Sequence, residues 1–270
     1  MPEGPEIRRA ADALAGAVLK APLERVYFAF PELKRHEERL TGRRILAIEP
    51  RGKALLTRFD NGWTLYSHNQ LYGVWQVGKP GMPPKTTRSL RVELATAKKA
   101  IRLYSASDVS LWRDGEIEAH PFLQRIGPDV LDAALTVAAV DARLLDRRFA
   151  GRQLSALLLD QAFLAGMGNY LRSEVLFEAG LHPDRRPREL DAEERQALAR
   201  ALLAVPQRSY RTRGIRRSRG MRAEYTQTGG GAFRFCVFDR AGEPCVACGE
   251  MIQRVERATR RLYLCPRCQG

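Results

Sequence analysis

The sequence lacks the long apolar run that a membrane-spanning helix requires. No eighteen consecutive apolar residues occur among the 270, and the richest stretch, LSALLLDQAFLAG, is interrupted by Asp160 and Gln161. The first six residues, MPEGPE, hold glutamates where a secretory signal peptide carries lysines. Both absences argue against a membrane or exported protein, and we expect a soluble protein without a membrane partner.

Cysteine is also scarce, and its distribution is uneven. The chain holds five cysteines, four of which are clustered near the C-terminus. Small secreted domains that depend on disulfides are rich in cysteine. The pattern favours instead a reducing compartment and a metal site.

Acidic residues are too few to balance the basic ones. The 45 Lys and Arg face 31 Asp and Glu, which leaves a net charge of +14 and a pI near 10.1. From Val205 to Gly270, 14 Arg stand against 5 Asp and Glu, so +9 of the +14 lies in this last quarter. A charge for solubility alone would be spread more evenly. We therefore expect a binding surface for a polyanion, nucleic acid before membrane.

The apolar pattern predicts regions of different structure along the chain. A helix is expected over residues 7–19, where apolar residues recur at helical spacing. Seven short β-type runs with turn signals follow between Leu23 and Leu111, which is typical of an antiparallel sandwich or barrel. A linker at 120–131 precedes four predicted helices, at 136–149, 152–166, 169–180 and 190–205. Asp191 and Glu194 have capping-box spacing, and the last forty residues are β-like.

The strongest single motif is a pair of CxxC sequences, Cys245-x2-Cys248 and Cys265-x2-Cys268, separated by sixteen residues. This spacing is typical of a zinc ribbon, and four thiolates close a tetrahedral site without a position for water. We therefore predict one structural zinc ion, which stabilises a hairpin too small to fold alone. The fifth cysteine, Cys236, stands apart and is interpreted as a buried bystander.

Two further turns carry polar side chains suited to a nucleic acid. Between the CxxC pairs, ERATRR places Arg257, Arg260 and Arg261 at a hairpin tip, which is either a solvated basic turn or a fingertip in a DNA groove. The rigid zinc site behind it favours the fingertip. Upstream, LAGMGNYL joins two predicted helices through a glycine turn, and the N–H groups at the helix start near Asn169 suit a phosphate. A plain helical hairpin explains the same residues.

Two loops of the β region hold candidate residues as well. Lys53 follows a glycine turn, and Gln70, Leu71 and Tyr72 lie in the loop SHNQLYG between two strands. Taken alone, Lys53 is an ordinary surface lysine, and Leu71 and Tyr72 are core residues that enter the next strand. The functional alternative is an apolar wedge that fills the gap left in a base stack by a flipped nucleotide.

The N-terminus offers a candidate nucleophile. Removal of Met1 would leave Pro2 with a free secondary amine, and because an α-amino group has a pKa of about 8, a useful fraction is neutral at pH 7. Attack of this amine on a sugar C1′ carbon forms an iminium ion, and Glu3 beside it would donate a proton to the ring oxygen. A helix start explains Pro5 and Glu6 but leaves Pro2 and Glu3 without a role.

Six motifs in this order resemble the formamidopyrimidine-DNA glycosylase/endonuclease VIII family of base-excision repair enzymes. They are PEGPE, RGK, SHNQLYG, HPFLQRIGPD, DQAFLAGMGNYL and the four-cysteine finger, and they cover essentially the whole chain. The chain looks closest to bacterial endonuclease VIII, because that branch has the Gln-Leu-Tyr wedge. The resemblance implies an α+β multidomain fold: a catalytic β-sandwich with a helix over 1–124, a helix-two-turn-helix domain over 125–231 and a zinc finger over 232–270.

The resemblance also implies a role for each matching residue. Pro2 would be the Schiff-base nucleophile, Glu3 the proton donor and Lys53 the lysine of β-elimination. Arg260 matches the arginine of δ-elimination, although Arg261 is close enough to confuse the assignment. The DNA-contacting positions of the family correspond to Gln70, Leu71, Tyr72, Arg125 and Asn169.

The implied function is a bifunctional DNA glycosylase/AP lyase, a monomer of the bacterial cytoplasm or nucleoid. It would remove oxidised pyrimidines from damaged double-stranded DNA and cut the strand by β,δ-elimination. The alternatives are the same chemistry on oxidised purines, a damaged-DNA-binding protein without the chemistry, and a zinc-ribbon transcription or RNA-binding factor. Intact Pro2, Glu3 and Lys53 argue against the binding protein. The arginine-rich loop at 211–231 departs from endonuclease VIII, so the preferred lesion stays open.

Overall fold

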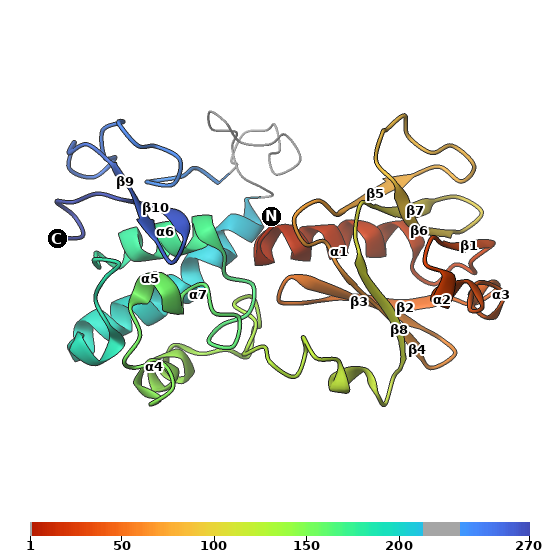
Figure 1. The fold of residues 1–270 in the computed structure, drawn as a ribbon, viewed down its shortest axis with the longest axis horizontal. Helices are drawn as coiled ribbons and strands as arrows, with labels where there is room; N and C mark the ends of the chain where they lie inside the picture. The colour runs from red at the N-terminus through yellow and green to blue at the C-terminus, as the bar shows by residue number, and fades with distance from the viewer. Residues whose placement is uncertain (1, 213–232) are drawn as a thin grey trace. The chain divides into compact units, whose positions relative to one another are not determined.

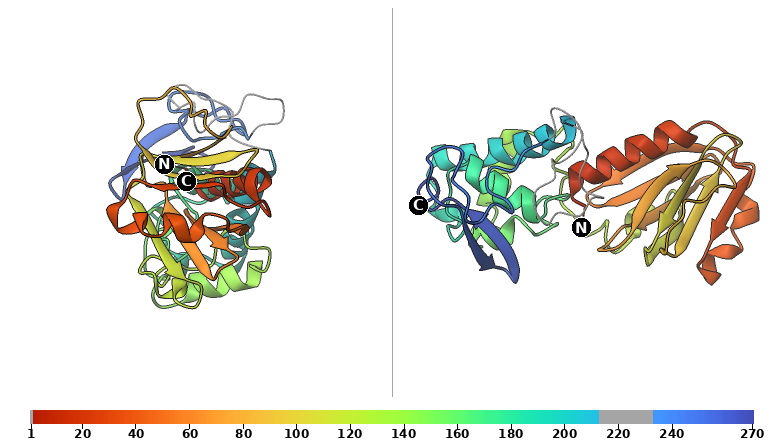
Figure 2. Two further views of the ribbon diagram at one scale, coloured as in Figure 1. Left: turned by 90° about the vertical axis from the view of Figure 1, so that its right-hand side faces the viewer. Right: turned by 90° about the horizontal axis from the view of Figure 1, so that it is seen from above.

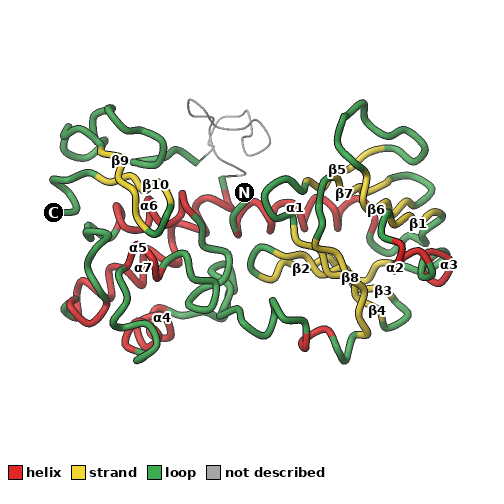
Figure 3. Tube along the Cα trace, viewed as in Figure 1, coloured by secondary structure: helices red, strands yellow, loops and turns green. Residues whose placement is uncertain are grey.

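The computed structural model describes residues 2–212 and 233–270, which form two compact units (Figure 1). The first unit holds Pro2 and residues 7–124, and the second holds residues 3–6 together with the described part of 125–270. Strands dominate the first unit and helices the second (Figure 3). The arginine-rich loop expected at 211–231 lies, from residue 213 on, outside the described residues.

The first unit consists of one long helix, eight strands and three short helical turns. Its elements are α1 (Gly4–Val18), whose first turn is counted with the second unit, β1 (Arg25–Phe28), α2 (Pro31–Lys34), α3 (Glu37–Leu40), β2 (Ile45–Arg51), β3 (Ala54–Phe59), β4 (Trp63–His68), β5 (Val74–Gly78), β6 (Leu90–Ala95), β7 (Ala100–Tyr104), β8 (Asp108–Arg113) and the 3-10 helix η1 (Ile117–Ala119). The predicted helix and the seven predicted strands are confirmed. The strand β8 and the helices α2 and α3 were not predicted; α2 and α3 are single turns, too short to show helical periodicity.

Two four-stranded antiparallel sheets build the predicted β-sandwich. Their strand orders are β1-β6-β7-β5 and β2-β3-β4-β8. Side chains from both sheets and from α1 share one apolar core, which includes Ile7, Leu14, Phe28, Phe59 and Ile101. Figure 2 shows α1 running alongside the strands. Because burial of each such side chain contributes about 1.5–3 kcal/mol, this unit has an ordinary hydrophobic basis for stability.

The second unit contains helices followed by a two-stranded sheet. Its elements are α4 (Val137–Leu145), α5 (Leu154–Leu157), α6 (Asn169–Glu178), the 3-10 helix η2 (Pro187–Glu189), α7 (Ala192–Arg211), β9 (Gln253–Arg257) and β10 (Arg260–Leu264). The predicted capping box opens α7, since Asp191 and Glu194 each accept the backbone N–H of the other at 2.9 Å. Over the described part of the chain, no helix is both long and apolar enough to cross a membrane.

The helix predicted over 152–166 is wrong, because only the single turn of α5 is helical there. Asp160 accepts the N–H of Ala162 at 2.8 Å, and the Gln161 amide donates to Met167 O at 2.9 Å. These side chains occupy backbone groups that a longer helix would need for its own hydrogen bonds. The apolar pattern reflects burial rather than helix, and two successive turns join α5 to α6.

The segment 236–238, which precedes the four-cysteine region, is attached to α6 through a buried carboxylate. Glu174 accepts the N–H groups of Cys236, Val237 and Phe238 at 2.8–3.0 Å. Burial raises the pKa of Glu174, and the three N–H bonds oppose that rise. Cys236 is half-buried, and burial together with Glu174 raises the pKa of its thiol to about 12. This thiol is therefore protonated at neutral pH, as suits a bystander.

Candidate active site and zinc centre

The Glu3 side chain is fixed at the start of α6. Its Oε1 accepts the N–H of Tyr170 at 2.9 Å, and its Oε2 accepts the N–H of Leu171 at 3.2 Å. Only 4% of Glu3 is exposed. The first N–H groups of a helix lack partners and carry the positive end of its dipole, so a carboxylate is stabilised there. The residue directly after Pro2 thus presents a buried carboxyl group in one orientation.

Two of the N–H groups at this helix start, where a phosphate was expected, are not available to it. The N–H groups of Tyr170 and Leu171, which would bind it, are occupied by Glu3. Gly168 is the N-cap of α6, and a Cβ atom there would lie 2.3 Å from Glu3 Cδ and 2.4 Å from Oε1. Only glycine leaves room for the carboxylate. The glycine turn therefore binds the Glu3 side chain at these two N–H groups.

Glu3 also belongs to a polar network with Glu6, Tyr170 and Ser209 that was not predicted from the sequence. Glu6 Oε2 accepts the Glu3 N–H at 3.0 Å, which is one half of a capping box at the start of α1. The Tyr170 hydroxyl lies 3.2 Å from both Glu6 oxygens and 3.1 Å from Ser209 Oγ. The spacing Glu3-x-x-Glu6 was the available signal, and its meaning was obscured because Glu6 also suits the helix dipole.

Lys53 occupies a tight hairpin turn between β2 and β3. Arg51 pairs with Ala54, so Gly52 and Lys53 form a two-residue turn. Gly52 has a φ of 63°, a conformation that glycine adopts without steric cost. Lys53 is only 8% exposed, so it is not the ordinary surface lysine of the simpler interpretation.

The side chains of the expected wedge are exposed in the first unit. Leu71 is 44% exposed and Tyr72 is 59% exposed, whereas the next strand, β5, begins only at Val74. The interpretation of Leu71 and Tyr72 as core residues is therefore wrong. Gly73 closes the loop, because its N–H donates to Asn69 O at 2.7 Å and a Cβ there would lie 2.5 Å from that oxygen.

We call residues 67–73 the wedge loop. Three side chains hold its backbone and the side-chain amide of Gln70. Gln70 has a φ of 50°, and its N–H donates to His68 Nδ1 at 2.9 Å. Ser107 Oγ donates to Gln70 Oε1 at 2.6 Å, and Arg88 Nη1 donates to Tyr72 O at 2.6 Å. Burial lowers the pKa of His68, which Asp108 opposes and Lys53 reinforces. A neutral His68 can accept the Gln70 N–H, whereas a protonated one cannot.

The remaining predicted residues belong to the second unit. Arg125 is exposed at its beginning, Asn169 is half-exposed at the first position of α6, and Arg260 and Arg261 are exposed at the start of β10. Asn169 does not cap α6; its Oδ1 accepts a hydrogen bond from Arg172 at 2.7 Å. Adjacent strand residues point to opposite faces, so Arg260 and Arg261 serve different sides of the hairpin.

The four cysteines of the CxxC pairs meet at one point. Their Sγ atoms all lie within 4.8 Å of one another. Cys245 and Cys268 are 3.9 Å apart and Cys248 and Cys265 are 3.5 Å apart, too long for disulfides of about 2.05 Å. A zinc–sulfur bond of about 2.3 Å gives a tetrahedral sulfur–sulfur edge of about 3.8 Å. The cluster therefore fits a zinc ion.

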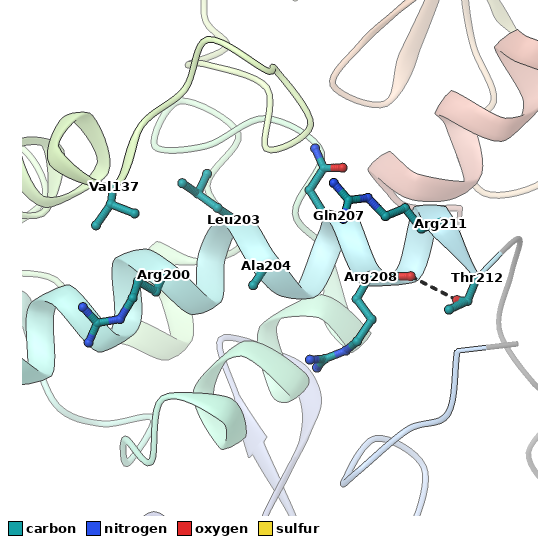
Figure 4. A pocket seen from close by; sticks show the side chains of 8 residues that line it. All are labelled: Val137, Arg200, Leu203, Ala204, Gln207, Arg208, Arg211 and Thr212. Atoms are coloured by element: carbon teal, nitrogen blue, oxygen red, sulfur yellow. Dashed lines mark hydrogen bonds between the residues drawn. The ribbon is translucent and has the colours of Figure 1, made fainter. Parts of the chain in front are cut away.

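A separate cavity of about 780 Å³ runs along α7 (Figure 4). It is lined by Val137, Arg200, Leu203, Ala204, Gln207, Arg208, Arg211 and Thr212. None of the residues with a predicted role lines it, so this groove is distinct from the candidate site.

Three protein-family domains match the chain in the order of its structure. The formamidopyrimidine-DNA glycosylase N-terminal domain matches residues 1–106, and the H2TH domain of the same family matches residues 126–219. The zinc finger found in FPG and IleRS matches residues 242–270. Together with the geometry of the four sulfur atoms, this last match establishes one structural zinc ion as the cofactor.

Relatives and solved structures agree with these matches. The chain is 53% identical to Endonuclease 8 of Shigella sonnei and 55% identical to Endonuclease 8 of Salmonella agona, over 269 residues and the whole length of each. A Lactococcus lactis Fpg complex with an abasic site containing DNA has a TM-score of 0.83 at 21% identity, covering 99% of both chains. The chain therefore belongs to the formamidopyrimidine-DNA glycosylase family, in which Endonuclease 8 and Fpg enzymes are DNA glycosylase/AP lyases.

Proposed function

We propose that this protein removes oxidised pyrimidines from double-stranded DNA and then cuts the strand, with Pro2 as the nucleophile after removal of Met1. The proposal assigns the proton donor to Glu3, β-elimination to Lys53 and δ-elimination to Arg260. The residues proposed to contact DNA are Gln70, Leu71, Tyr72, Arg125 and Asn169. We further propose that the protein acts as a monomer in the bacterial cytoplasm, with domains at 1–124, 125–231 and 232–270.

The proposed reaction consists of base removal, two eliminations and hydrolysis of the iminium ion. The Pro2 nitrogen attacks C1′, the damaged base leaves with a proton, and the sugar ring opens as Glu3 protonates its oxygen, which yields an iminium ion. Loss of a C2′ proton, with Lys53 as the base, expels the 3′ phosphate. In a second elimination, assisted by Arg260, loss of a C4′ proton expels the 5′ phosphate. Water then hydrolyses the iminium and restores the amine.

The observation that carries this proposal is the position of the Glu3 carboxylate. It is buried next in sequence to Pro2 and is held by two backbone N–H groups. A helix cap alone could be supplied by Ser, Thr, Asp or Asn from the residue directly before the helix. Here the cap comes from a residue 167 positions away, which favours a role for the carboxylate beyond capping.

Borohydride trapping tests the proposal directly. The protein is incubated with a duplex that contains a single oxidised pyrimidine or a single oxidised purine, in the presence of borohydride. We expect a covalent protein–DNA adduct, formed faster with the pyrimidine and absent in Pro2→Gly. Full adduct yield in Pro2→Gly would remove Pro2 as nucleophile, and no adduct with either lesion would favour a binding protein. Faster trapping of the purine lesion would reverse the proposed preference.

A further inference from the structure

Arg172 is a fully buried charged group that the predicted mechanism leaves without a role. It lies in the first turn of α6, and none of its surface is exposed. A buried guanidinium must have hydrogen-bond partners, because burial of an unpaired charge is costly. Burial lowers the pKa of Arg172 to about 10, so the group is still charged at neutral pH.

The partners of Arg172 come from three separate parts of the second unit. The two terminal nitrogens donate four hydrogen bonds: Nη1 to Ser155 O at 2.7 Å and Arg257 O at 3.3 Å, and Nη2 to Asn169 Oδ1 at 2.7 Å and Arg261 O at 3.1 Å. The charges of Glu3 and Arg260 are also close enough to affect its pKa. One guanidinium thus joins α5, the first residue of α6 and both strands of the zinc-bound hairpin.

The two hairpin carbonyls that Arg172 binds flank a strained turn. Ala258 has a φ of 52° and Thr259 a φ of 58°, and Arg257 pairs with Arg260 across them. Such a turn favours Asn and Gly, whereas a β-branched residue such as threonine is disfavoured at positive φ. Strained backbone of this kind persists only where the surroundings hold it in place. The hydrogen bonds that Arg172 donates to Arg257 O and Arg261 O hold this turn in place.

We propose that Arg172 is a positioning residue that fixes the turn carrying Arg260 and orients the Asn169 side chain toward DNA. This inference rests on the proposed function, because it concerns the placement of Arg260 for δ-elimination. Lysine cannot replace arginine here, since a single ammonium group lacks the planar fork that reaches four acceptors on three segments.

The test compares Arg172→Lys with the wild-type protein on a labelled duplex that contains one abasic site. β-Elimination leaves an unsaturated aldehyde on the 3′ end and β,δ-elimination leaves a 3′ phosphate, and the two products separate on a denaturing gel. We expect the δ-to-β product ratio to fall on the order of tenfold. Borohydride trapping at saturating enzyme, which depends on Pro2, should stay within about twofold. Arg195→Lys is the matched control, since Arg195 binds Asp141 and Leu190 O and should leave the ratio unchanged.

A rescue variant separates positioning from general stability. Ala258→Asn/Thr259→Gly favours the same turn by itself, so adding it to Arg172→Lys should restore most of the product ratio. If Arg172→Lys loses zinc, the triple variant decides: recovery of zinc and ratio supports the proposal, and no recovery overturns it. An unchanged ratio in Arg172→Lys, or equal loss of trapping and ratio, also overturns it. Failure of wild-type protein to form any Pro2-dependent adduct would instead count against the proposed function.

Discussion

Two hairpin turns carry the lysine and the arginine proposed for the elimination steps, and they are built differently. Both are two-residue turns, Gly52-Lys53 between β2 and β3 and Ala258-Thr259 between β9 and β10. The first has a glycine at positive φ and belongs to a four-stranded sheet. The second has two non-glycine residues at positive φ and belongs to a two-stranded sheet.

The difference concerns what stabilises each turn. An isolated two-stranded hairpin is at best marginally stable in water, whereas a sandwich supplies a hydrophobic face. The hairpin of Lys53 therefore depends on apolar burial. The hairpin of Arg260 depends on four thiolates and on the Arg172 guanidinium.

Zinc removal should produce the largest difference in stability between the two hairpins. Cys265→Ser, or chelation of the wild-type protein, is expected to unfold the β9–β10 hairpin and lower DNA strand cleavage by about 100-fold or more, because structural zinc supplies folding free energy directly. The sandwich should keep its β-sheet circular dichroism signal. Cys236→Ser is the control, as this thiol lies outside the cluster. Zinc content and cleavage are measured together; a Cys265→Ser protein that cuts DNA normally would contradict this dependence.

The glycine beside Glu3 gives the next largest expected effect. Gly168→Ala places a methyl group on the carboxylate, so we expect base excision to slow on the order of 100-fold as Glu3 is displaced. Gly16→Ala, in α1, meets no atom within 4 Å and should leave the rate unchanged. Single-turnover excision of an oxidised pyrimidine measures this. Equal rates for the two alanine variants would show that Glu3 tolerates the added methyl group.

Gly73 is a glycine of the first unit that, like Gly168, has no room for a Cβ atom. Gly73→Ala would push against Asn69 O and open the wedge loop, and we expect weaker binding of damaged duplex by about tenfold, since part of the unstacking energy is no longer offset. The maximal rate should change less than the affinity. Gly115→Ala, which has open space around its Cβ position, is the control. Fluorescence anisotropy gives the affinities, and unchanged binding by Gly73→Ala would argue that the loop shape is unimportant.

The smallest expected effect is the pH dependence of folding stability that arises from His68. Its folded pKa is lowered below about 6.5, so only the unfolded chain takes up the proton just below that pH. Stability is therefore full above about pH 6.5 and decreases as the pH falls toward the folded pKa. We expect a decrease in melting temperature of no more than about 2–4 °C, lost in His68→Gln. NMR titration of the imidazole checks the direction, and a pKa above 6.5 would contradict it.

The strands of the sandwich and most of the helices were predictable because their patterns are local. Alternating and helical periodicities identified β1 to β7, α1, α4, α6 and α7, and cysteine spacing identified the zinc site. The segment 152–166 was mispredicted because a buried pair of turns is as apolar as a helix.

Contacts between distant parts of the chain were not predictable in the same way. Glu3 was predicted as a candidate, but its hydrogen bonds to Tyr170 and Leu171 join residues 167 and 168 positions apart. Arg172 was overlooked because an arginine in a helical sequence is usually a surface residue. Two of its hydrogen bonds go to backbone carbonyl groups of the hairpin. Every residue has such a carbonyl, so the sequence does not indicate which ones Arg172 binds.

The carboxylate of Glu3 at the start of α6 has a consequence for how this protein can vary. One group both caps a helix and is proposed to deliver a proton, so selection for a durable fold and selection for a fast reaction act on the same two oxygen atoms. Glu3→Gln retains an oxygen that can accept an N–H, whereas Glu3→Ala retains none. Glu3→Ala therefore loses the helix cap and the proposed proton donor together, whereas Glu3→Gln loses the proton donor and keeps part of the cap.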